Sequence, residues 1–199
     1  RDSVFTMQYN RNLPKEERVN GIIVHRYAYS GNYVSPDGFR SFGGILKYSV
    51  GSFKQLLGSD YDIYYANQWP MLHSLCVKPV AAPLIQEWCE VWTNCVKVTV
   101  MQRLLKHVGD YHVAVSEFTR QRLSNILKID NSKVVVIPNG VDFAKFNSSR
   151  PKVWGRIVYA GRIVPHKRVK LLVNAFRKVK KKIPSAELHI IGSGPELQS

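Results

Sequence analysis

Hydrophobic and polar positions along the chain predict strands and helices in alternation. Short apolar runs bounded by turn residues predict strands at residues 22–27, 61–66, 83–86, 111–115 and 133–137. Apolar residues at helical spacing predict a helix over residues 45–57, and Ser116 is placed to cap a second helix that continues to Leu127. Residues 31–44, with four glycines and one proline, predict a loop.

The same alternation starts again after a polar, proline-bearing segment at residues 147–151. A strand is predicted at 156–160, a helix from 168 to 182 and a strand at 187–191. The helix carries one apolar stripe and is otherwise covered by basic residues. Strands that alternate with helices favour an α/β fold with parallel sheets. We therefore predict two domains, residues 1–146 and 156–199, joined by a linker at 147–155.

Charge indicates an anionic partner without choosing one. The chain has 199 residues, is 45% hydrophobic and carries a formal net charge of +15. Residues 151–199 hold 11 of the 29 basic residues but two of the 14 acidic ones. Nucleic acid, anionic lipid headgroups and nucleotide diphosphates all suit such a field.

Metal and membrane signals are weak in this sequence. The three cysteines and six histidines lack the spacing of metal ligands, and the cysteines are expected to be reduced thiols. No window reaches the roughly 18 apolar residues that a spanning helix needs, so we expect a cytoplasmic or peripheral protein. Because the chain begins at Arg1 and stops just after a glycine turn, we expect it to be a piece of a longer protein.

Two loops at the predicted carboxyl ends of strands are the strongest candidates for ligand binding. In open parallel sheets, ligands bind outside these strand ends. The first loop, residues 161–167, places Arg162 and Lys167 just before a helix N-terminus, where backbone N–H groups also favour an anion. The alternative is that both are ordinary solvated charges. The second loop, residues 192–195, has only part of a dinucleotide-binding fingerprint.

Several blocks of sequence, taken in order, resemble family 4 glycosyltransferases of the two-domain GT-B type. They are Val136-Ile137-Pro138-Asn139-Gly140-Val141-Asp142, Val158-Tyr159-Ala160-Gly161-Arg162 with Lys167, and His189-Ile190-Ile191-Gly192-Ser193-Gly194-Pro195-Glu196. Asp110 and the segment 114–119 are similar to the last strand and helix of the family's N-domain. The resemblance is strong from residue 61 to residue 196. It implies two Rossmann-like domains, both incomplete in this chain.

The resemblance also implies a function and a set of site residues. The expected reaction transfers a sugar from a nucleotide-sugar donor to a sugar or lipid-linked acceptor, with retention of configuration and without a metal or other cofactor. Arg162 and Lys167 match the positions that hold the donor diphosphate. Gly161, Gly192 and Gly194 match positions near the nucleotide. The loop at 31–44 is either a plain connection or a mobile acceptor-side loop.

Two departures from the family pattern affect the expected site. Many members have a glycine after the lysine, but here Arg168 follows Lys167 and crowds the loop. The family's active-site histidine falls at Cys89, which cannot replace imidazole in its hydrogen bonds. Cys89 and Glu90 are therefore the catalytic candidates, with Glu87 as a further nearby carboxylate.

The sequence leaves alternatives open for the basic helix, for the tryptophans and for the function. The lysines of residues 168–182 form either a solvated helix face or a patch for an anionic membrane. Trp69, Trp88 and Trp92 are expected in the core rather than on a sugar platform. The rival functions are a basic, non-catalytic binding module and an inactive glycosyltransferase remnant. Nucleic acid is the less favoured partner, because no nucleic-acid-binding signature is present.

Overall fold

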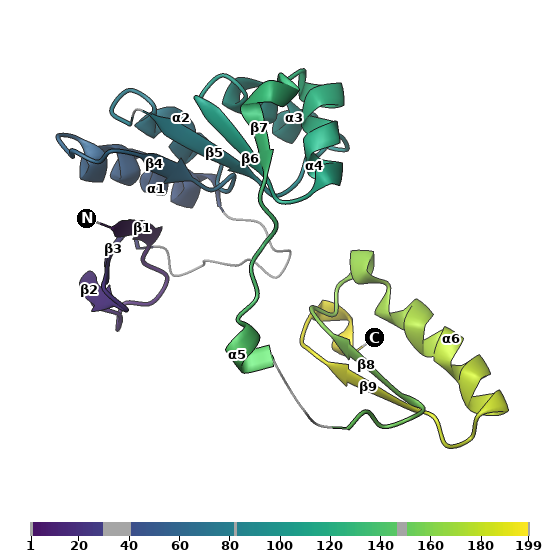
Figure 1. Ribbon diagram of the computed structural model, residues 1–199. Coiled ribbons are helices and arrows are strands. Elements are labelled where there is room, and N and C mark those ends of the chain that lie inside the picture. Colours follow the sequence, from purple (N-terminus) through teal and green to yellow (C-terminus); the bar gives the residue numbers. More distant parts are fainter. Residues whose placement is uncertain (1, 30–40, 82, 147–150, 199) are drawn as a thin grey trace. The chain divides into compact units, whose positions relative to one another are not determined.

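A computed structural model describes residues 2–29, 41–81, 83–146 and 151–198 of the chain (Figure 1). It divides into two compact units, Arg1–Gly140 and Val141–Ser199. The predicted loop at 31–44 lies mostly outside the described residues, as does the start of the predicted linker at 147–155.

The first unit begins with a small three-stranded sheet. Its strands are β1 (Ser3–Met7), β2 (Glu16–Val19) and β3 (Ile22–Tyr27), in the order β1-β3-β2. β1 pairs with β3 in parallel, and β2 pairs with β3 as an antiparallel hairpin. Helix α1 (Phe42–Leu56) follows, and the Ser41 hydroxyl caps it by accepting from the Gly44 N–H at 3.2 Å.

The second sheet of this unit is fully parallel and holds the core. Its strands lie in the order β4-β5-β6-β7, with bounds Tyr64–Ala66, Leu84–Trp88, Tyr111–Ala114 and Val134–Val136. Parallel strands need crossover connections, and helices supply them. These are α2 (Leu72–Val77), α3 (Val96–Leu105), and α4 (Glu117–Arg122) with its continuation η1 (Leu123–Leu127) and the short turn η2 (Asn131–Lys133).

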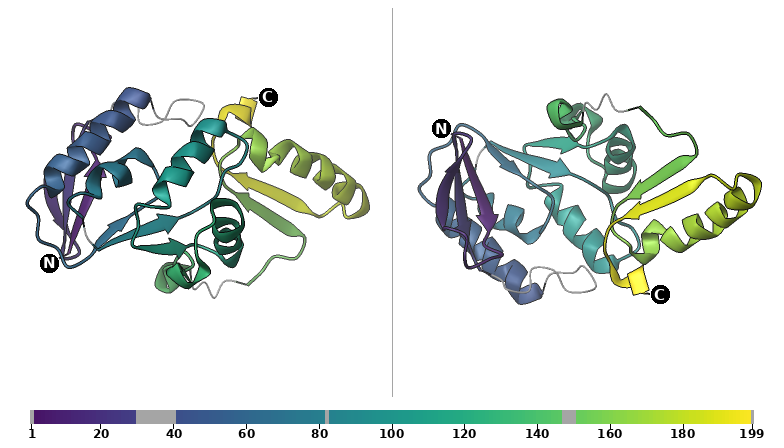
Figure 2. Two further views of the ribbon diagram at one scale, coloured as in Figure 1. Left: turned by 90° about the horizontal axis from the view of Figure 1, so that it is seen from above. Right: turned by 90° about the horizontal axis from the view of Figure 1, so that it is seen from below.

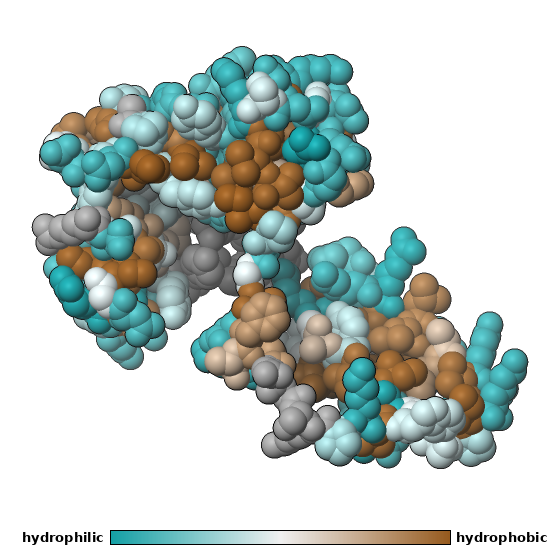
Figure 3. Space-filling view, viewed as in Figure 1, coloured by the Kyte–Doolittle hydropathy of each residue, from teal (hydrophilic) through white to brown (hydrophobic). Residues whose placement is uncertain are grey.

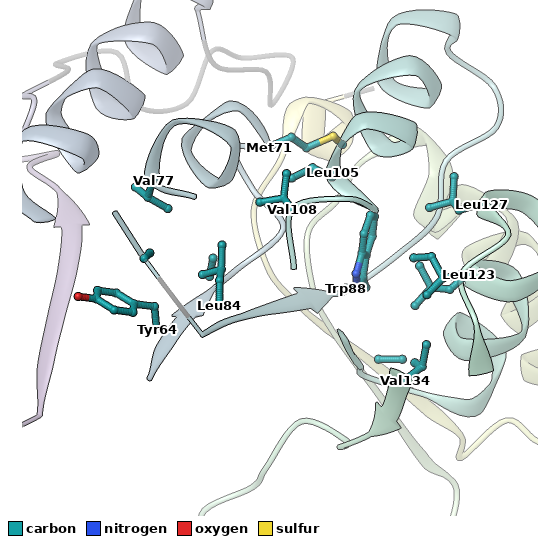
Figure 4. Close-up of a cluster of buried hydrophobic side chains, with 14 of the residues drawn as sticks. Tyr64, Met71, Val77, Leu84, Trp88, Leu105, Val108, Leu123, Leu127 and Val134 are labelled. Carbon is teal, nitrogen blue, oxygen red and sulfur yellow. The ribbon is translucent and has the colours of Figure 1, made fainter. Parts of the chain in front are cut away.

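A contiguous apolar cluster is buried between this sheet and its helices. Trp88 at the end of β5 is fully buried and lies between Leu105 and Val108 on one side and Leu123 and Leu127 on the other (Figure 4). The Trp88 indole N–H donates to His112 Nδ1 at 3.0 Å, so its polar atom is satisfied inside the core. The Asp110 carboxylate accepts a hydrogen bond from the Leu84 N–H at 2.8 Å and forms an ion pair with Lys78 at 2.7 Å. These two contacts join the starts of β5 and β6 to the end of α2.

The second unit has fewer elements. It contains α5 (Phe143–Phe146), β8 (Arg156–Ala160), η3 (Pro165–Lys167), α6 (Val169–Lys182), β9 (Glu187–Ile191) and η4 (Pro195–Gln198). β8 and β9 pair in parallel, with Arg156 opposite Glu187 and Ala160 opposite Ile191. Figure 2 shows α6 running alongside these two strands in both views.

Apolar side chains remain at the surface of the second unit. Figure 3 shows them gathered there in brown. Ile157, Val158, Leu171, Ile190 and Ile191 are all exposed. The apolar stripe that predicts α6 therefore packs only in part, since Val169 is the one buried residue among the described positions of that helix.

The predicted α/β class with parallel strands is confirmed. The predicted bounds of β3, β8 and β9 match the structure, and α6 begins one residue later than predicted. The prediction of a loop up to Gly44 is wrong at its end, because α1 begins at Phe42. The units divide at Gly140, so α5 belongs to the second unit, whereas the sequence predicted residue 146 as the end of the first domain.

Candidate functional site

The candidate site residues lie in two regions, one in each unit, at the carboxyl ends of parallel strands. In the first unit they follow β4 and β5. In the second they follow β8 and β9. Loops at these strand ends are where open parallel sheets bind ligands.

Polar groups gather where β4 and β5 end. The Asn67 side-chain amide donates to the Glu87 carboxylate at 2.7 Å and lies 3.9 Å from the Cys89 sulfur. Cys89 is half-buried and Asn67 is exposed. A thiol and a carboxylate therefore share one amide donor at the surface of the sheet end, rather than lying in the apolar core.

This environment shifts two titratable groups in the same direction. Burial raises the pKa of the Cys89 thiol, and the neighbouring carboxylates of Glu87 and Glu90 raise it further, against the lowering effect of Asn67. Burial also raises the pKa of the Tyr65 hydroxyl, with additional contributions from Glu87 and Cys89. Cys89 is thus held as a neutral thiol at pH 7, a poor nucleophile but a group that can donate a weak hydrogen bond.

Glu90 follows directly and points from an irregular loop. Its side chain is exposed, but its backbone N–H donates to Gln68 Oε1 at 3.1 Å. Its carbonyl accepts from Gln68 Nε2 at 2.8 Å and from Gln102 Nε2 at 3.3 Å. Sequence reasoning missed both glutamines. Their only sequence signal is a polar residue within an otherwise apolar stretch.

Two tryptophans beside this loop are not in the core. Trp69 and Trp92 are 38% and 37% exposed and meet edge to face, with ring centroids 6.5 Å apart. The prediction of a core position is confirmed for Trp88 and wrong for these two, because each follows the strand end on a loop outside the helical layer.

A groove of about 490 Å³ opens next to the polar cluster within the first unit. One wall comes from β1, including Ser3 and Phe5, and another from β4, including Tyr65. Asn67 and Trp69 also line it. The Ser3 hydroxyl is buried without a partner among the described residues.

In the second unit, the loop after β8 carries two exposed cations. Arg162 and Lys167 are exposed, and within the described part of the chain neither has an ion-pair partner. The Tyr159 hydroxyl donates to the Arg162 carbonyl at 2.9 Å and fixes the backbone there. Lys167 closes the short helix η3, directly before α6 begins.

Arg168 joins η3 to α6 in an unusual conformation. Its φ and ψ are +52° and +40°, in the left-handed region that favours glycine. The sequence expectation that Arg168 crowds this loop stays a prediction, since the backbone angles describe its conformation only. The position adopts the geometry of a glycine while holding a long cationic residue.

The loops after β8 and β9 are bonded to each other through their backbones. Gly161 N–H donates to the Ile191 carbonyl at 3.0 Å, and Ile163 N–H donates to the Ser193 carbonyl at 2.8 Å. A Cβ at Gly192 would lie 1.9 Å from the Gly161 oxygen, and one at Gly194 would lie 2.2 Å from the Ile163 oxygen. Both glycines are therefore required because the backbones of the two loops lie in direct contact at these positions.

The structure brings together each group of predicted residues within its own unit. Cys89 and Glu90 lie at the end of β5, and Arg162, Lys167, Gly161, Gly192 and Gly194 surround the ends of β8 and β9. Their roles toward a donor stay predictions. Over the described ranges, no three His, Cys, Asp or Glu side chains form a cluster suited to a metal, and no helix could cross a membrane.

Comparison with known proteins decides the family. A model of Glycosyltransferase Family 4 matches residues 3–145, and a model of Glycosyl transferases group 1 matches residues 141–199. The chain belongs to glycosyltransferase family 4. The predicted resemblance, including the GT-B fold class, is confirmed.

Curated relatives of this family 4 chain include phosphatidyl-myo-inositol mannosyltransferases. The protein of Mycobacterium tuberculosis is 28% identical over 183 residues, covering 84% of this chain and 48% of the relative. That of Mycolicibacterium smegmatis is 24% identical over 188 residues, covering 85% and 47%. The chain thus spans about half the length of the curated relatives it matches.

Solved structures similar to the family 4 chain support the fold. A glycosyltransferase from Rickettsia africae matches with a TM-score of 0.50 at 18% identity, covering 87% of this chain and 56% of that one. A UDP-N-acetylglucosamine 2-epimerase from Rickettsia bellii matches with a TM-score of 0.54 at 11% identity, covering 98% and 62%. At these identities the likeness concerns the fold.

Proposed function

We propose that this chain forms part of an enzyme that transfers a sugar from a nucleoside-diphosphate donor to an acceptor hydroxyl. Family membership gives the reaction class. The observation that carries the donor assignment is the pair of exposed cations Arg162 and Lys167, which have no ion-pair partner among the described residues and lie on the loop that leads into α6. A leaving diphosphate gains negative charge in the transition state, and fixed cations beside it lower the barrier.

The α6 N-terminus adds to the same anion site. The first N–H groups of a helix lack partners within the helix, and the helix dipole favours an anion there. With protein cations in this place, the proposed reaction proceeds without a metal, and retention of configuration is part of the proposal. A chelator should then leave donor binding unchanged.

The acceptor is proposed to be a lipid-linked polyol or sugar. The curated relatives are named for mannosyl transfer to phosphatidyl-myo-inositol, which motivates this choice. We place the acceptor near Cys89 and Glu90, where the exposed carboxylate of Glu90 is available to a hydroxyl group. The raised pKa of Cys89 fits a neutral hydrogen-bonding thiol better than a nucleophile.

The test of the donor assignment compares three alanine variants in one binding assay. Arg162→Ala and Lys167→Ala should each weaken nucleoside-diphosphate binding by about 10 to 100-fold, as expected for a charge-assisted hydrogen bond of roughly 1.5–3 kcal/mol. Where turnover is measurable, the loss should reach about 100 to 1,000-fold. Binding is measured by calorimetry at low and high salt.

Lys178→Ala is the matched control, because Lys178 is an exposed cation farther along α6. It should change binding less than about twofold. Equal, mild losses in all three variants would mean that a general basic surface attracts the nucleotide, which would contradict the donor assignment.

Peripheral contact with an anionic membrane is proposed as a second property of the enzyme. α6 carries exposed Lys170, Lys178, Lys181 and Lys182 and no acidic residue. Each lysine near an anionic bilayer contributes about 1 kcal/mol. The test is co-sedimentation with vesicles of which about one third is anionic lipid. Replacing Lys178, Lys181 and Lys182 by Gln should lower the bound fraction by about tenfold or more. Equal sedimentation with neutral vesicles would refute it.

A further inference from the structure

Two fully buried glutamines hold the loop that carries both catalytic candidates. Gln68 follows β4 and Gln102 lies in α3, and neither side chain has exposed surface. Burial of a primary amide is costly unless its hydrogen bonds are made. Here the amides bind the backbone of residues 89–92 rather than each other or the sheet.

The hydrogen bonds from these two side chains cover four backbone groups in sequence. Gln68 Oε1 accepts from the N–H of Cys89 at 3.0 Å and of Glu90 at 3.1 Å, and Gln68 Nε2 donates to the Glu90 carbonyl at 2.8 Å. Gln102 Nε2 donates to the same carbonyl at 3.3 Å, and Gln102 Oε1 accepts from the Trp92 N–H at 3.2 Å.

Other elements complete the restraint on this loop. Arg122 of α4 donates to the Val91 carbonyl at 2.9 Å, and the Thr99 hydroxyl donates to the Trp92 carbonyl at 3.2 Å. Buried backbone groups need partners, and here side chains supply them because the segment is neither helix nor strand. The directions in which Cys89 and Glu90 leave the backbone are thereby set by side chains from α3, from α4 and from the loop after β4.

We propose that Gln68 and Gln102 are positioning residues, which fix the backbone of residues 89–92 so that Cys89 and Glu90 face the acceptor. The inference rests on the proposed function for its consequence in catalysis, but its structural part stands on the loop alone. Groups that do chemistry work when surrounding hydrogen bonds hold them in place. A displacement of about 1 Å costs on the order of 100-fold in rate.

The test replaces each glutamine by methionine, which keeps the length and removes the hydrogen bonds. The first readout is the rate at which iodoacetamide alkylates Cys89, measured by peptide mass spectrometry. The assay runs from about pH 7 to about pH 10, a range that brackets the ordinary thiol pKa. Gln68→Met should speed alkylation by about tenfold and shift its pH midpoint down toward that of a free thiol, since the freed loop moves Cys89 into solvent. Gln102→Met should act in the same direction.

The second readout is turnover of nucleoside-diphosphate hexoses, measured as release of the nucleotide. Gln68→Met should lower kcat by about 100-fold with little change in KM, because it disturbs position rather than binding. Gln68→Glu keeps an acceptor oxygen for the Cys89 and Glu90 N–H groups. Its alkylation rate and its kcat should therefore lie between those of Gln68→Met and those of the unchanged protein.

Gln86→Met is the matched control for burial. Gln86 is also without exposed surface, but its amide donates to the carbonyls of Ala66 and Glu87 in the sheet rather than to residues 89–92. It should leave Cys89 alkylation unchanged, whatever it does to the melting temperature.

Each outcome decides the proposal. An unaltered alkylation rate in both Gln68→Met and Gln102→Met would overturn the restraint. Alkylation could be faster in Gln68→Met and Gln102→Met while their kcat falls no more than that of Gln86→Met. The glutamines would then have only a structural role, and their positioning role would be overturned. Turnover is measured in the complete enzyme of which this chain forms part. Absence of turnover there would overturn the proposed function, while alkylation would still report on the loop.

Discussion

The two units hold the loops of their candidate site residues by different means. In the first unit, side chains of Gln68 and Gln102 bind the backbone of residues 89–92 above a continuous apolar core. In the second, the loops after β8 and β9 bind each other through backbone groups, and glycines permit the contact. The first arrangement depends on helices packed around the sheet. The second depends on two strands and their turns.

Burial follows the same division. The continuous apolar cluster is drawn entirely from residues 56–134. The buried apolar residues of the second unit are Ile163, Val164, Val169 and Ala186, and three of these four lie in or next to the loop of the cations. A pair of strands with one helix gains little apolar burial, so the second unit should open more readily than the first.

Truncation of leucine gives the largest expected difference between the units. Leu105 in α3 is fully buried, so Leu105→Ala should lower the free energy of unfolding of the first unit by about 2–5 kcal/mol. Leu171 in α6 is 60% exposed, and Leu171→Ala should change the second unit by less than about 0.5 kcal/mol. Hydrogen exchange resolved by peptide measures both. Similar losses in the two units would show that Leu171 is covered in solution.

Acid should weaken the first unit selectively. Burial lowers the pKa of His112 to about 4, with a further lowering by Lys133 that Asp110 opposes in part. Between that value and the ordinary pKa of about 6.5, the unfolded chain binds a proton that the folded unit excludes. The stabilisation is complete above pH of about 6.5 and is lost as pH falls toward about 4, a total of roughly 3 kcal/mol.

The check is the melting temperature of the first unit between pH of about 7 and 4.5, a window chosen from the ordinary histidine pKa. His112→Asn keeps an acceptor for the Trp88 indole and removes the titration, so its curve should be nearly flat over this range. A parallel fall in both proteins would assign the acid sensitivity to other groups.

The sequence predicted helices and strands well where the spacing of apolar residues or a bounding glycine marked their ends. α6 has a clear apolar stripe, and β8 and β9 are five-residue runs closed by glycines, so their bounds were recovered. β1, β2, α2 and α3 were not predicted. β2 and α2 have only four and six residues, and the ten residues of α3 begin with apolar residues at every second position, which does not indicate a helix. The segment η1, which is a π-helix, was predicted only as continuing helix, since a change of hydrogen-bond pattern leaves no mark on apolar spacing.

The sequence names candidate site residues, whose roles stay predictions, but it does not reveal what surrounds them. Arg162 and Lys167 could be named from their loop and from resemblance. That Asn67 bridges Glu87 and Cys89 depends on β4 and β5 being neighbours, which spacing along the chain does not reveal. The exposure of Trp69 and Trp92 was hidden for the same reason, because apolar character alone predicts burial.

Glycine substitution at left-handed positions gives the smallest expected effect. Arg168 in the second unit and Lys128 in the first have φ of +52° and +59°. Relief of left-handed strain outweighs the added freedom of the unfolded chain, so Arg168→Gly and Lys128→Gly should each stabilise their unit by about 0.5–1 kcal/mol. Unfolding followed separately in each unit tests this. A loss of stability in Arg168→Gly alone would reveal a contact of the arginine side chain.

The contact of Gly192 and Gly194 with the facing loop also limits how this protein can evolve. Any side chain at either position would have to occupy the space of a backbone oxygen, so neither position can gain a new group for a different ligand. Insertions in one loop would break its register with the other. Under the proposed function, new ligand preferences in this unit would therefore arise through the exposed side chains at 162 and 166–168, while the backbone that presents them stays the same.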